Sequence, residues 1–465
     1  MISRFLTILL AALLTIPALA TDEASERTAL RDSILSLVSG ATVSQHEVPL
    51  SRFGARGDSL TDCHRAFQRA MRYACKHGGA RIVLTPGVWL CRGPIHLVDN
   101  VTIDIREGAT LKFVGDPVAY LPMVETSWEG TFLWNYSPFI YGRGLCNVAI
   151  IGRGTIDGDA AQTFATWKEL QQADQQQSRD QNHQGLPVAE RRFGQGHYLR
   201  PQLVQLYDCR AVTIADVMIR RAPFWCLHLL RSENIRLEGI RYDAKLVNND
   251  GIDIESSRNV LIEDIHFDNG DDNIAIKSGR DNDGWNLSGP SANILIRRCH
   301  FKGLHAVVIG SEMSGGVENV VVEQCDYAGY CKRGIFVKTN PDRGGFVRRI
   351  YINKVKFGEV LDLFYVTSMY AGQGLSNNHY SAVEDIHVDQ LSARQVNGTA
   401  LVLQGTEARP LRAISFRRVT ADAVAHGLSF ENTEPVLLQD CHLGERVGVP
   451  SQVSAADKIF EQNNK

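Results

Sequence analysis

The chain has 465 residues and a formal net charge of -3, with 49 Lys and Arg against 52 Asp and Glu. Hydrophobic residues make up 44% and charged residues 22%, which is ordinary for a soluble globular protein and excludes a disordered, collagenous or multi-span membrane protein. Because positive charge is not in excess, the composition also argues against a nucleic-acid partner. It still allows a local basic cleft that binds a small acidic substrate.

Residues 1–20 predict a signal peptide. Arg4 precedes an apolar run of 12 residues at 5–16, and an A-x-A ending lies at 18–20. A charged start, a short apolar core and this ending are typical of secretory signals. The alternative, a membrane anchor, is disfavoured because the run is short for a span. We expect cleavage after Ala20, export to the periplasm or the extracellular space, and no membrane span in the mature chain.

Residues 21–50 predict an N-terminal helical extension. Between Glu23 and Ser39 the apolar residues, Leu30 and Ile34 among them, have helical spacing, and Gly40 follows as a typical helix end. We expect this short helix to pack on the main body of the protein.

Short runs of alternating apolar and polar residues recur from residue 51 to residue 445. Nine of them start 22 to 36 residues apart, and their first residues are Val212, Ile235, Val260, Ile294, Val320, Ile350, Ile386, Ile414 and Val436. Alternation indicates strands with one buried face, and repeats of this length without intervening helices are typical of a parallel β-helix. We therefore predict an all-β parallel β-helix over residues 51–445, followed by a C-terminal tail at 446–465. An antiparallel sandwich is the alternative.

Residues 159–199 interrupt this pattern with a polar, Gln-rich stretch. A segment of that length without strands, inside a compact domain, is usually functional or disordered. We expect an ordered rim over a cleft.

The ten cysteines show no C-x-x-C spacing, which disfavours a zinc ribbon or a thioredoxin-type redox site. Export permits disulfides. We expect the nearest pair, Cys325 and Cys331, to form one, and several other cysteines to lie in the core.

Polar residues gather at the ends of successive strands between residues 248 and 338. Asp250 and Asp271 are 21 residues apart, which is close to one coil, and stacked strands lie roughly 4.8 Å apart. We therefore expect Asp250, Asp271 and Asp272 to crowd together on one face, with His305 and Lys338 on the following coils.

This crowding points to acid–base chemistry. Like charges at short range raise the pKa of at least one carboxyl, and a protonated acid beside an ionised base is what glycosidic cleavage requires. Taken singly, each Asp is more often part of a solvated turn, and His305 or Lys338 is more often structural. The sequence at 281–284, Asp-Asn-Asp-Gly, lacks the closing Glu of a calcium loop and is interpreted as a turn. We predict neither a metal nor a cofactor.

These motifs resemble those of glycoside hydrolase family 28, the polygalacturonase family. NNDGID at 248–253 is similar to the family's NTDG(F/I)D, NGDDNIAIKSG at 269–279 to its DD segment, and LHAVVIGSE at 304–312 to its GHG-x-x-IGS segment. HYLRPQLVQLYDC at 197–209 and GSEMSGGVENV at 310–320 resemble the bacterial exo-acting branch. The resemblance runs from about residue 51 to residue 370.

The resemblance implies a right-handed parallel β-helix with an open cleft. It also implies metal-independent, inverting, exo-acting hydrolysis of α-linked galacturonate in pectic polysaccharides or oligosaccharides. The insertion at 159–199 is similar to loops that close one end of the cleft in exo-acting members.

Residue by residue, the resemblance makes Asp271 the general acid, and Asp250 and Asp272 the pair that shares the attacking water as general base. His305 orients this group. Lys338 pairs with a substrate carboxylate.

Two further residues, Asn248 and Tyr370, are expected to contact the substrate, the latter as a stacking surface.

One position departs from the family. The family pattern is R-x-K, and Phe336 stands where its Arg is expected. A phenyl ring cannot clamp a carboxylate as a guanidinium does. Either Arg333, Arg343 or Arg280 replaces the lost charge, or the neighbouring subsite binds an uncharged or branched sugar. Two other functions also stay open, a β-helix lyase or epimerase acting on uronates and a non-catalytic binding module.

Overall fold

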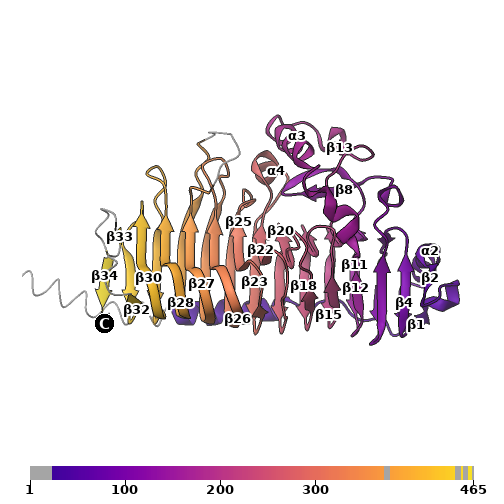
Figure 1. Cartoon of the computed structure of the whole chain (residues 1–465), viewed down its shortest axis with the longest axis horizontal. Coiled ribbons are helices and arrows are strands. Elements are labelled where there is room, and N and C mark those ends of the chain that lie inside the picture. The colour runs from indigo at the N-terminus through magenta and orange to yellow at the C-terminus, as the bar shows by residue number, and fades with distance from the viewer. Residues whose placement is uncertain (1–22, 371–377, 446–451, 454–458, 463–465) are drawn as a thin grey trace, which may run out of the picture.

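The computed structural model describes residues 23–370, 378–445, 452–453 and 459–462. The predicted signal peptide and most of the predicted C-terminal tail therefore lie outside the described residues. The described chain forms an elongated right-handed parallel β-helix, which confirms the predicted fold (Figure 1). Among the described strands every pairing is parallel except one hairpin, formed by β8 (Val124–Trp128) and β9 (Thr131–Asn135).

Strands stack into three ladders along the solenoid. The first ladder contains the predicted repeats: β1 (Glu47–Pro49), β3 (Ala80–Leu84), β6 (Val101–Ile105), β11 (Cys146–Ile151), β15 (Arg210–Ala215), β18 (Glu233–Glu238), β21 (Arg258–Glu263), β23 (Ser291–Arg297), the first parts of β26 (Val317–Lys338), β27 (Phe346–Thr367) and β28 (Ala382–Gln404), then β29 (Arg412–Arg417), β31 (Val436–Gln439) and β34 (Ile459–Gln462). The second, which carries the polar strand ends, contains β5 (Ile95–His96), β10 (Ile140–Arg143), β14 (Val204–Tyr207), β17 (Leu227–Leu230), β20 (Ile252–Glu255), β22 (Asp272–Lys277), β25 (His305–Gly310), the last parts of β26 to β28, β30 (Thr420–Glu431) and β33 (Gln452–Val453). The third contains β2 (Asp58–Asp62), β4 (Gly87–Cys91), β7 (Ala109–Phe113), β12 (Thr155–Asp157), β16 (Met218–Arg220), β19 (Arg241–Asp243), β24 (His300–Phe301), the middle parts of β26 to β28, the first part of β30 and β32 (His442–Glu445).

The register of the first ladder follows the repeat in the sequence. Successive strands pair so that the first residues of eight predicted runs form one row, namely Val212, Ile235, Val260, Ile294, Val320, Ile350, Ile386 and Ile414. All of these side chains are buried in the core. Because they alternate with outward polar residues, the strands and their repeat could be predicted from the sequence.

Asparagines stack at the turn that leads into this ladder. Asn234, Asn259, Asn293 and Asn319 have φ values of 57°, 56°, 58° and 57°, and each amide from Asn259 onward donates to the amide oxygen one coil earlier. Asn tolerates the left-handed conformation, and its side chain bonds along the stack. This column of asparagine side chains therefore stabilises both the local backbone conformation and the spacing between coils.

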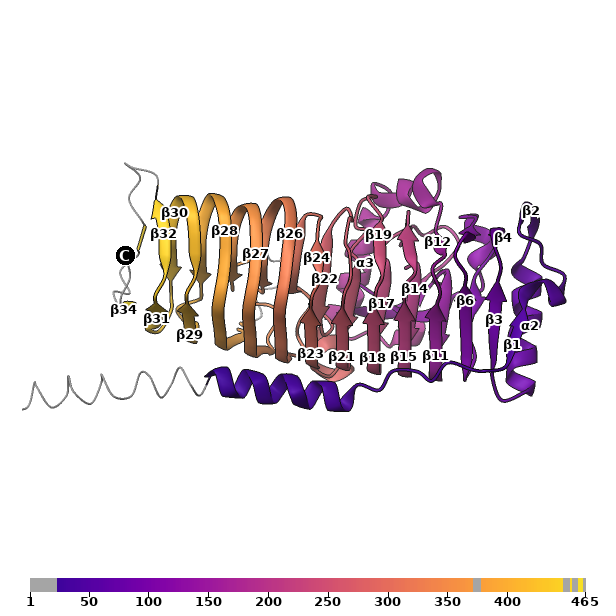
Figure 2. The same cartoon turned by 90° about the horizontal axis from the view of Figure 1, so that it is seen from below.

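One helix lies along the side of the solenoid, and another covers its N-terminal end. The predicted N-terminal helix covers residues 23–37 and runs along the outside of the coils (Figure 2), where Leu30 and Ile34 pack against Leu261 and Leu295. The helix α2 (His64–Lys76), which the sequence analysis did not predict, packs on the N-terminal end of the core. No described helix has the length and apolarity needed to cross a membrane.

Residues 159–199 form an ordered insertion. It contains η3 (Ala160–Gln162), η4 (Phe164–Lys168), α3 (Gln172–His183), η5 (Val188–Glu190) and β13 (Arg192–Phe193), and β13 pairs with β9. Together with β8 and β9, the insertion rises from the N-terminal half of the solenoid (Figure 1).

The predicted turn at 281–284 is wrong, because these residues begin the short helix α4 (Asp281–Asn286). Both of its first-turn carboxylates are buried. Asp281 lies 2.7 Å from His183, and Asp283 lies 2.5 Å from Arg191. Ion pairs with the insertion therefore replace the solvation that a turn would have needed, and they tie the insertion to the coils.

The predicted disulfide between Cys325 and Cys331 is also wrong, because both thiols are free. The two residues lie on the single strand β26, where they pair with Val355 and Val360 of the next coil. The chain turns between them at Gly329, whose φ is 87°, and each cysteine is level with a valine of the next coil, not with the other cysteine. Both thiols are buried in the core and behave as small apolar groups.

Candidate active site

Four of the predicted polar residues fall on one row of the second ladder, which we call the acid row. Asp272, His305 and Arg333 pair directly across β22, β25 and β26. Counting back from the paired Ile252 and Ile274 places Asp250 level with Asp272. Asp271 precedes Asp272 at the turn, so the three carboxylates are neighbours although Asp271 is not on the row itself.

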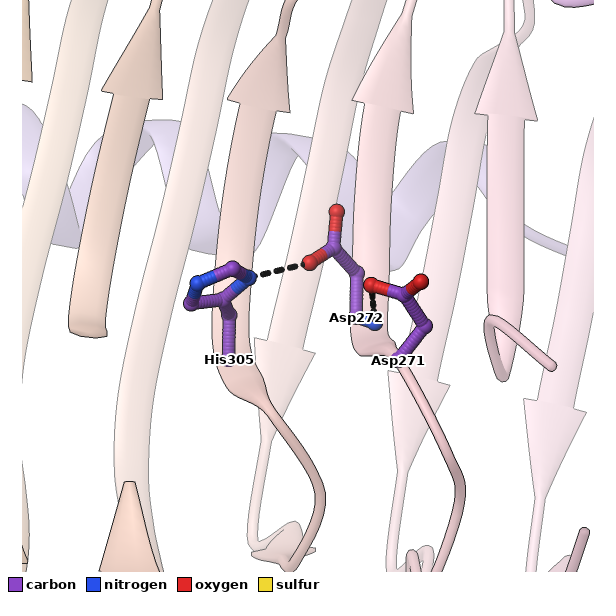
Figure 3. A group of neighbouring side chains, drawn as sticks. All are labelled: Asp271, Asp272 and His305. Carbon is purple, nitrogen blue, oxygen red and sulfur yellow. Dashed lines mark hydrogen bonds and ion pairs between the residues drawn. The ribbon is translucent and has the colours of Figure 1, made fainter. Parts of the chain in front are cut away.

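Asp272 is the most strongly held of the three acids. The His305 Nδ1 atom lies 2.6 Å from its Oδ1 oxygen (Figure 3). The Lys338 Nζ atom donates to its Oδ2 oxygen at 3.3 Å. Burial alone would raise the pKa of Asp272, but Lys338 and His305 outweigh it and lower that pKa well below its usual range. Asp272 is therefore ionised at neutral pH.

The pKa values of Asp271 and Asp250 are shifted in the opposite direction, upward. Burial and the neighbouring Asp272 charge raise the pKa of Asp271. Burial and the nearby Asp253 raise the pKa of Asp250 well above its usual value, and the Asp250 Oδ1 atom is buried without a hydrogen-bond partner among the described residues. The site thus combines two carboxyls whose pKa is raised with one whose pKa is lowered, the separation that acid–base catalysis needs.

Asn248 lies between the acid and a buried arginine. Its amide donates to the Asp271 Oδ2 atom at 3.2 Å, and its own oxygen accepts from Arg200 Nη2 at 2.7 Å. Arg200 is fully buried and also donates to Gln171, at the start of α3. Asn248 therefore lines the cleft and is fixed in orientation by Arg200.

On the C-terminal side of the acids, Phe336 forms an aromatic floor beneath two cations. The Arg333 guanidinium lies 4.6 Å from the centre of the Phe336 ring and 4.3 Å from that of Tyr365. The Lys338 ammonium lies 5.5 Å from Phe336 and 5.6 Å from Tyr370. A guanidinium thus stands over the ring that replaces the expected Arg.

A second group of charged side chains lies at or just after the C-terminal ends of β22, β25 and β26. Lys277 and Arg280 lie 3.2 Å and 2.9 Å from the two oxygens of Glu312, and Arg343 approaches the same carboxylate at 4.0 Å. All four side chains are buried. We call Lys277, Arg280, Glu312 and Arg343 the Glu312 cluster. Two more carboxylates adjoin it, Asp253 at 3.8 Å from Lys277 and Asp281 at 2.6 Å from Arg343.

The insertion and the β8–β9 hairpin complete the cleft above this cluster. Glu129, at the hairpin tip, and Arg179, from α3, line the same cleft as Asp250 and Asp271. All eight residues predicted for the site line it too: Asn248, Asp250, Asp271, Asp272, His305, Arg333, Lys338 and Tyr370.

Asp271, Asp272 and His305 also bring ligand-type atoms within 4.8 Å of one another. However, both Asp272 oxygens are already engaged, one by His305 and one by the Lys338 ammonium. A fixed cation 3.3 Å from the carboxylate opposes the binding of a second one. The donor set therefore suits proton transfer better than metal binding.

Sequence reasoning missed several residues of the cleft. Lys277 had a usable signal, because the runs NIAIKS, AVVIGS and GIFVKT place Lys277, Gly310 and Lys338 at equivalent positions, and the register puts them on one row. Glu129, Arg179 and Arg200 had no such signal, since they come from segments outside the repeat.

Comparisons with known proteins agree with this geometry. The model of the family "Glycosyl hydrolases family 28" matches residues 94–434. The chain is 29% identical over 398 residues to a probable polygalacturonase of Vitis vinifera, covering 82% of this chain and 75% of that protein. The exopolygalacturonase of Thermotoga maritima superposes with a TM-score of 0.84 at 36% identity, covering 89% of this chain and 96% of that one. The exopolygalacturonase of Yersinia enterocolitica shares the fold, with a TM-score of 0.74 at 18% identity, over 90% of this chain and 78% of that one. With its acid row, its cleft and nearly all its coils inside the matched region, the chain belongs to family 28 of the glycoside hydrolases.

Proposed function

We propose that this protein removes α-linked galacturonate from the ends of pectic polysaccharides or oligosaccharides by inverting hydrolysis. One observation carries the proposal: the carboxyls of Asp250, Asp271 and Asp272 share a single cleft with several cations. Arg333 and Lys338 come from β26, on a later coil, and Lys277 and Arg280 come from the end of β22 and the residues that follow it. Because every sugar of a galacturonan bears a carboxylate, two sugars that straddle the acids would each meet positive charge.

In this mechanism Asp271 is the general acid. Burial and the Asp272 charge raise its pKa, which favours the protonated form, and it gives its proton to the leaving glycosidic oxygen as the bond to the anomeric carbon breaks. Asp272 takes a proton from the attacking water, whose oxygen forms the new bond on the opposite face. Asp250 holds that water, and His305 orients Asp272. After turnover Asp271 is ionised and Asp272 protonated, and exchange with solvent restores both.

Arg333 supplies the charge that the family's missing Arg would have given. Its guanidinium is stacked above Phe336, one coil from His305, and its pairing with Asp362 is loose at 3.3 Å. It can therefore turn toward a carboxylate beside Lys338. Tyr370 adds a ring against which that sugar packs.

Exo action is supported by the ordered insertion, which walls the N-terminal side of the cleft with Arg179 and Glu129. The similarity to the exopolygalacturonase of Thermotoga maritima points the same way. The signal sequence at 1–20 supports export to the periplasm or the extracellular space.

The test is a product analysis on saturated trigalacturonate and polygalacturonate, with a chelator present in a parallel set. We expect release of small galacturonides from polymer without a rapid fall in viscosity, and unchanged rates in chelator. No cleavage of either substrate, with cleavage of a branched or neutral pectic fragment, would overturn the galacturonate assignment. A rapid viscosity fall would overturn exo action, and unsaturated products would indicate a lyase.

A further inference from the structure

The β8–β9 hairpin presents an unusual residue to the cleft. Trp128 pairs with Thr131, so Glu129 and Gly130 form a two-residue turn with φ values of 44° and 79°. Two positive φ values define the tight hairpin turn that favours Asn or Asp followed by Gly, and a Glu seldom occupies its first position.

The backbone of the tip is itself fastened to the wall of the cleft. The Arg280 backbone N–H donates to the Gly130 carbonyl at 2.9 Å. A Cβ on Gly130 would lie 2.9 Å from that same nitrogen, which shows how closely the tip is pressed on the wall of the cleft. The turn therefore needs Gly at its second position, while nothing in its backbone geometry calls for Glu at its first.

The Glu129 carboxylate is held at one oxygen only. Among the described residues, Gln175 donates to Oε2 at 2.7 Å and Arg179 donates to the same oxygen at 3.1 Å, while Arg280 approaches it at 4.0 Å. The side chain keeps 18% of its surface exposed and lines the cleft that contains Asp250 and Asp271. The carboxylate is thus positioned by the insertion, with Oε1 left for a ligand.

We propose that Glu129 recognises the free hydroxyl at the non-reducing end of the substrate and thereby selects chain ends. A carboxylate can only accept hydrogen bonds, and the terminal sugar offers a hydroxyl where an internal sugar carries the next sugar. The linking oxygen of an internal sugar has no proton to donate. An internal sugar would therefore leave Oε1 of Glu129 without a hydrogen-bond donor.

This inference rests on the proposed function and identifies the residue that sets its exo mode. The cations of the Glu312 cluster would neutralise the terminal sugar's carboxylate, while Glu129 accepts a hydrogen bond from the hydroxyl. Sites built to bind a substrate hydroxyl reject analogues that lack it far more strongly than apolar pockets reject a missing methylene. The two recognition elements are chemically distinct and can be tested apart.

The experiment compares two trigalacturonates, one saturated and one whose terminal sugar is a 4-deoxy, 4,5-unsaturated uronate. We expect the full-length wild-type enzyme to prefer the saturated trimer by at least about 100-fold in kcat/KM. In Glu129→Ala that preference should fall by about tenfold or more, because only the saturated trimer loses a contact. Since the same two trimers are compared in both enzymes, their difference in ring shape cancels.

Gln176→Ala is the matched control, because Gln176 is an exposed residue of the same helix α3 that does not line the cleft. It should keep the wild-type preference. Glu129→Gln, which preserves size, is measured beside Glu129→Ala and is used instead if the alanine variant has a lowered melting temperature; we expect it to lose part of the preference.

Failure of this inference can be told apart from failure of the proposed function. If the wild type cleaves neither trimer, the proposed function falls. If the wild type cleaves the saturated trimer, but the Glu129 variants slow both trimers equally or neither, the assignment of Glu129 is overturned while the proposed function stands.

Discussion

Replacing Lys338 by Met tests how the general base is kept ionised. The Lys338 ammonium lies 3.3 Å from the Asp272 carboxylate, with side-chain exposures of 12% and 3%. Met has a similar length and removes only the charge. The burial of Asp272 would then act with less opposition, so its pKa should rise toward the ordinary range of a carboxyl.

The size of the effect follows from the geometry. At an effective dielectric constant of about 20, two unit charges at this distance attract by about 5 kcal/mol. Water that enters the space left by the ammonium, together with the remaining His305 contact, reduces the change to roughly 1–3 pKa units. Because the active form of Asp272 is ionised, activity in the variant should be lost at a higher pH as the solution is acidified.

The assay is the pH dependence of kcat/KM on trigalacturonate, with the acid limb fitted separately from the maximum. Lys338→Met should move that limb upward by roughly 1–3 units and also lower the maximum, because the proposed function has Lys338 pair with a substrate carboxylate. Lys338→Arg, which keeps a cation, should leave the limb near its wild-type position. An unmoved limb in Lys338→Met would show that Asp272 does not depend on Lys338 for its charge.

Three further variants probe the site. Asp271→Asn should lower kcat by about 10²–10⁴-fold with an unchanged circular dichroism spectrum, since it removes the acid; full activity would refute that role. Arg333→Ala should raise KM for trigalacturonate by about 10–100-fold through loss of a charge-assisted contact, whereas Arg348→Ala, at an exposed ion pair outside the cleft, should not. Asp250→Asn should abolish most activity yet stabilise the fold at pH 7 by about 1–2 kcal/mol. The pKa of Asp250 is raised on folding, so the stability that its proton contributes is present below the unfolded pKa and is lost as pH rises. Denaturation curves should therefore show that Asp250→Asn gains less stability over the wild type near pH 4 than at pH 7. An equal gain at both pH values would count against the raised pKa.

The fold was predictable because its signal is repeated. Inward side chains such as Val260 and Ile294 recur at the start of each run and become register partners one coil apart. The acid row was predictable for a related reason, since the spacing from the 248–253 motif to Asp272 is close to one coil. What the sequence could not settle was which residue of the Asp271–Asp272 pair stands level with Asp250, because that depends on where the turn ends and the strand begins.

The remaining parts of the cleft depend on contacts between segments with no common pattern. Arg200 reaches Asn248 from beyond the insertion, and Glu129 meets Arg179 across 50 residues of chain. Such pairs are fixed by packing and by complementary charge, and neither leaves a periodic trace in the sequence. The misassigned Cys325–Cys331 pair has the same origin, since nearness in sequence says little where the chain turns between the two residues and each pairs with the next coil.

The most direct test of the central claim is the anomeric configuration of the sugar first released from α-linked trigalacturonate, followed by ¹H NMR within the first minutes of reaction. Single displacement by a water that Asp272 activates, with Asp271 as acid, predicts that the β-anomer appears first and only later equilibrates with the α-anomer. Release of the α-anomer first would mean a covalent intermediate and retention, and would contradict the roles assigned to these carboxylates.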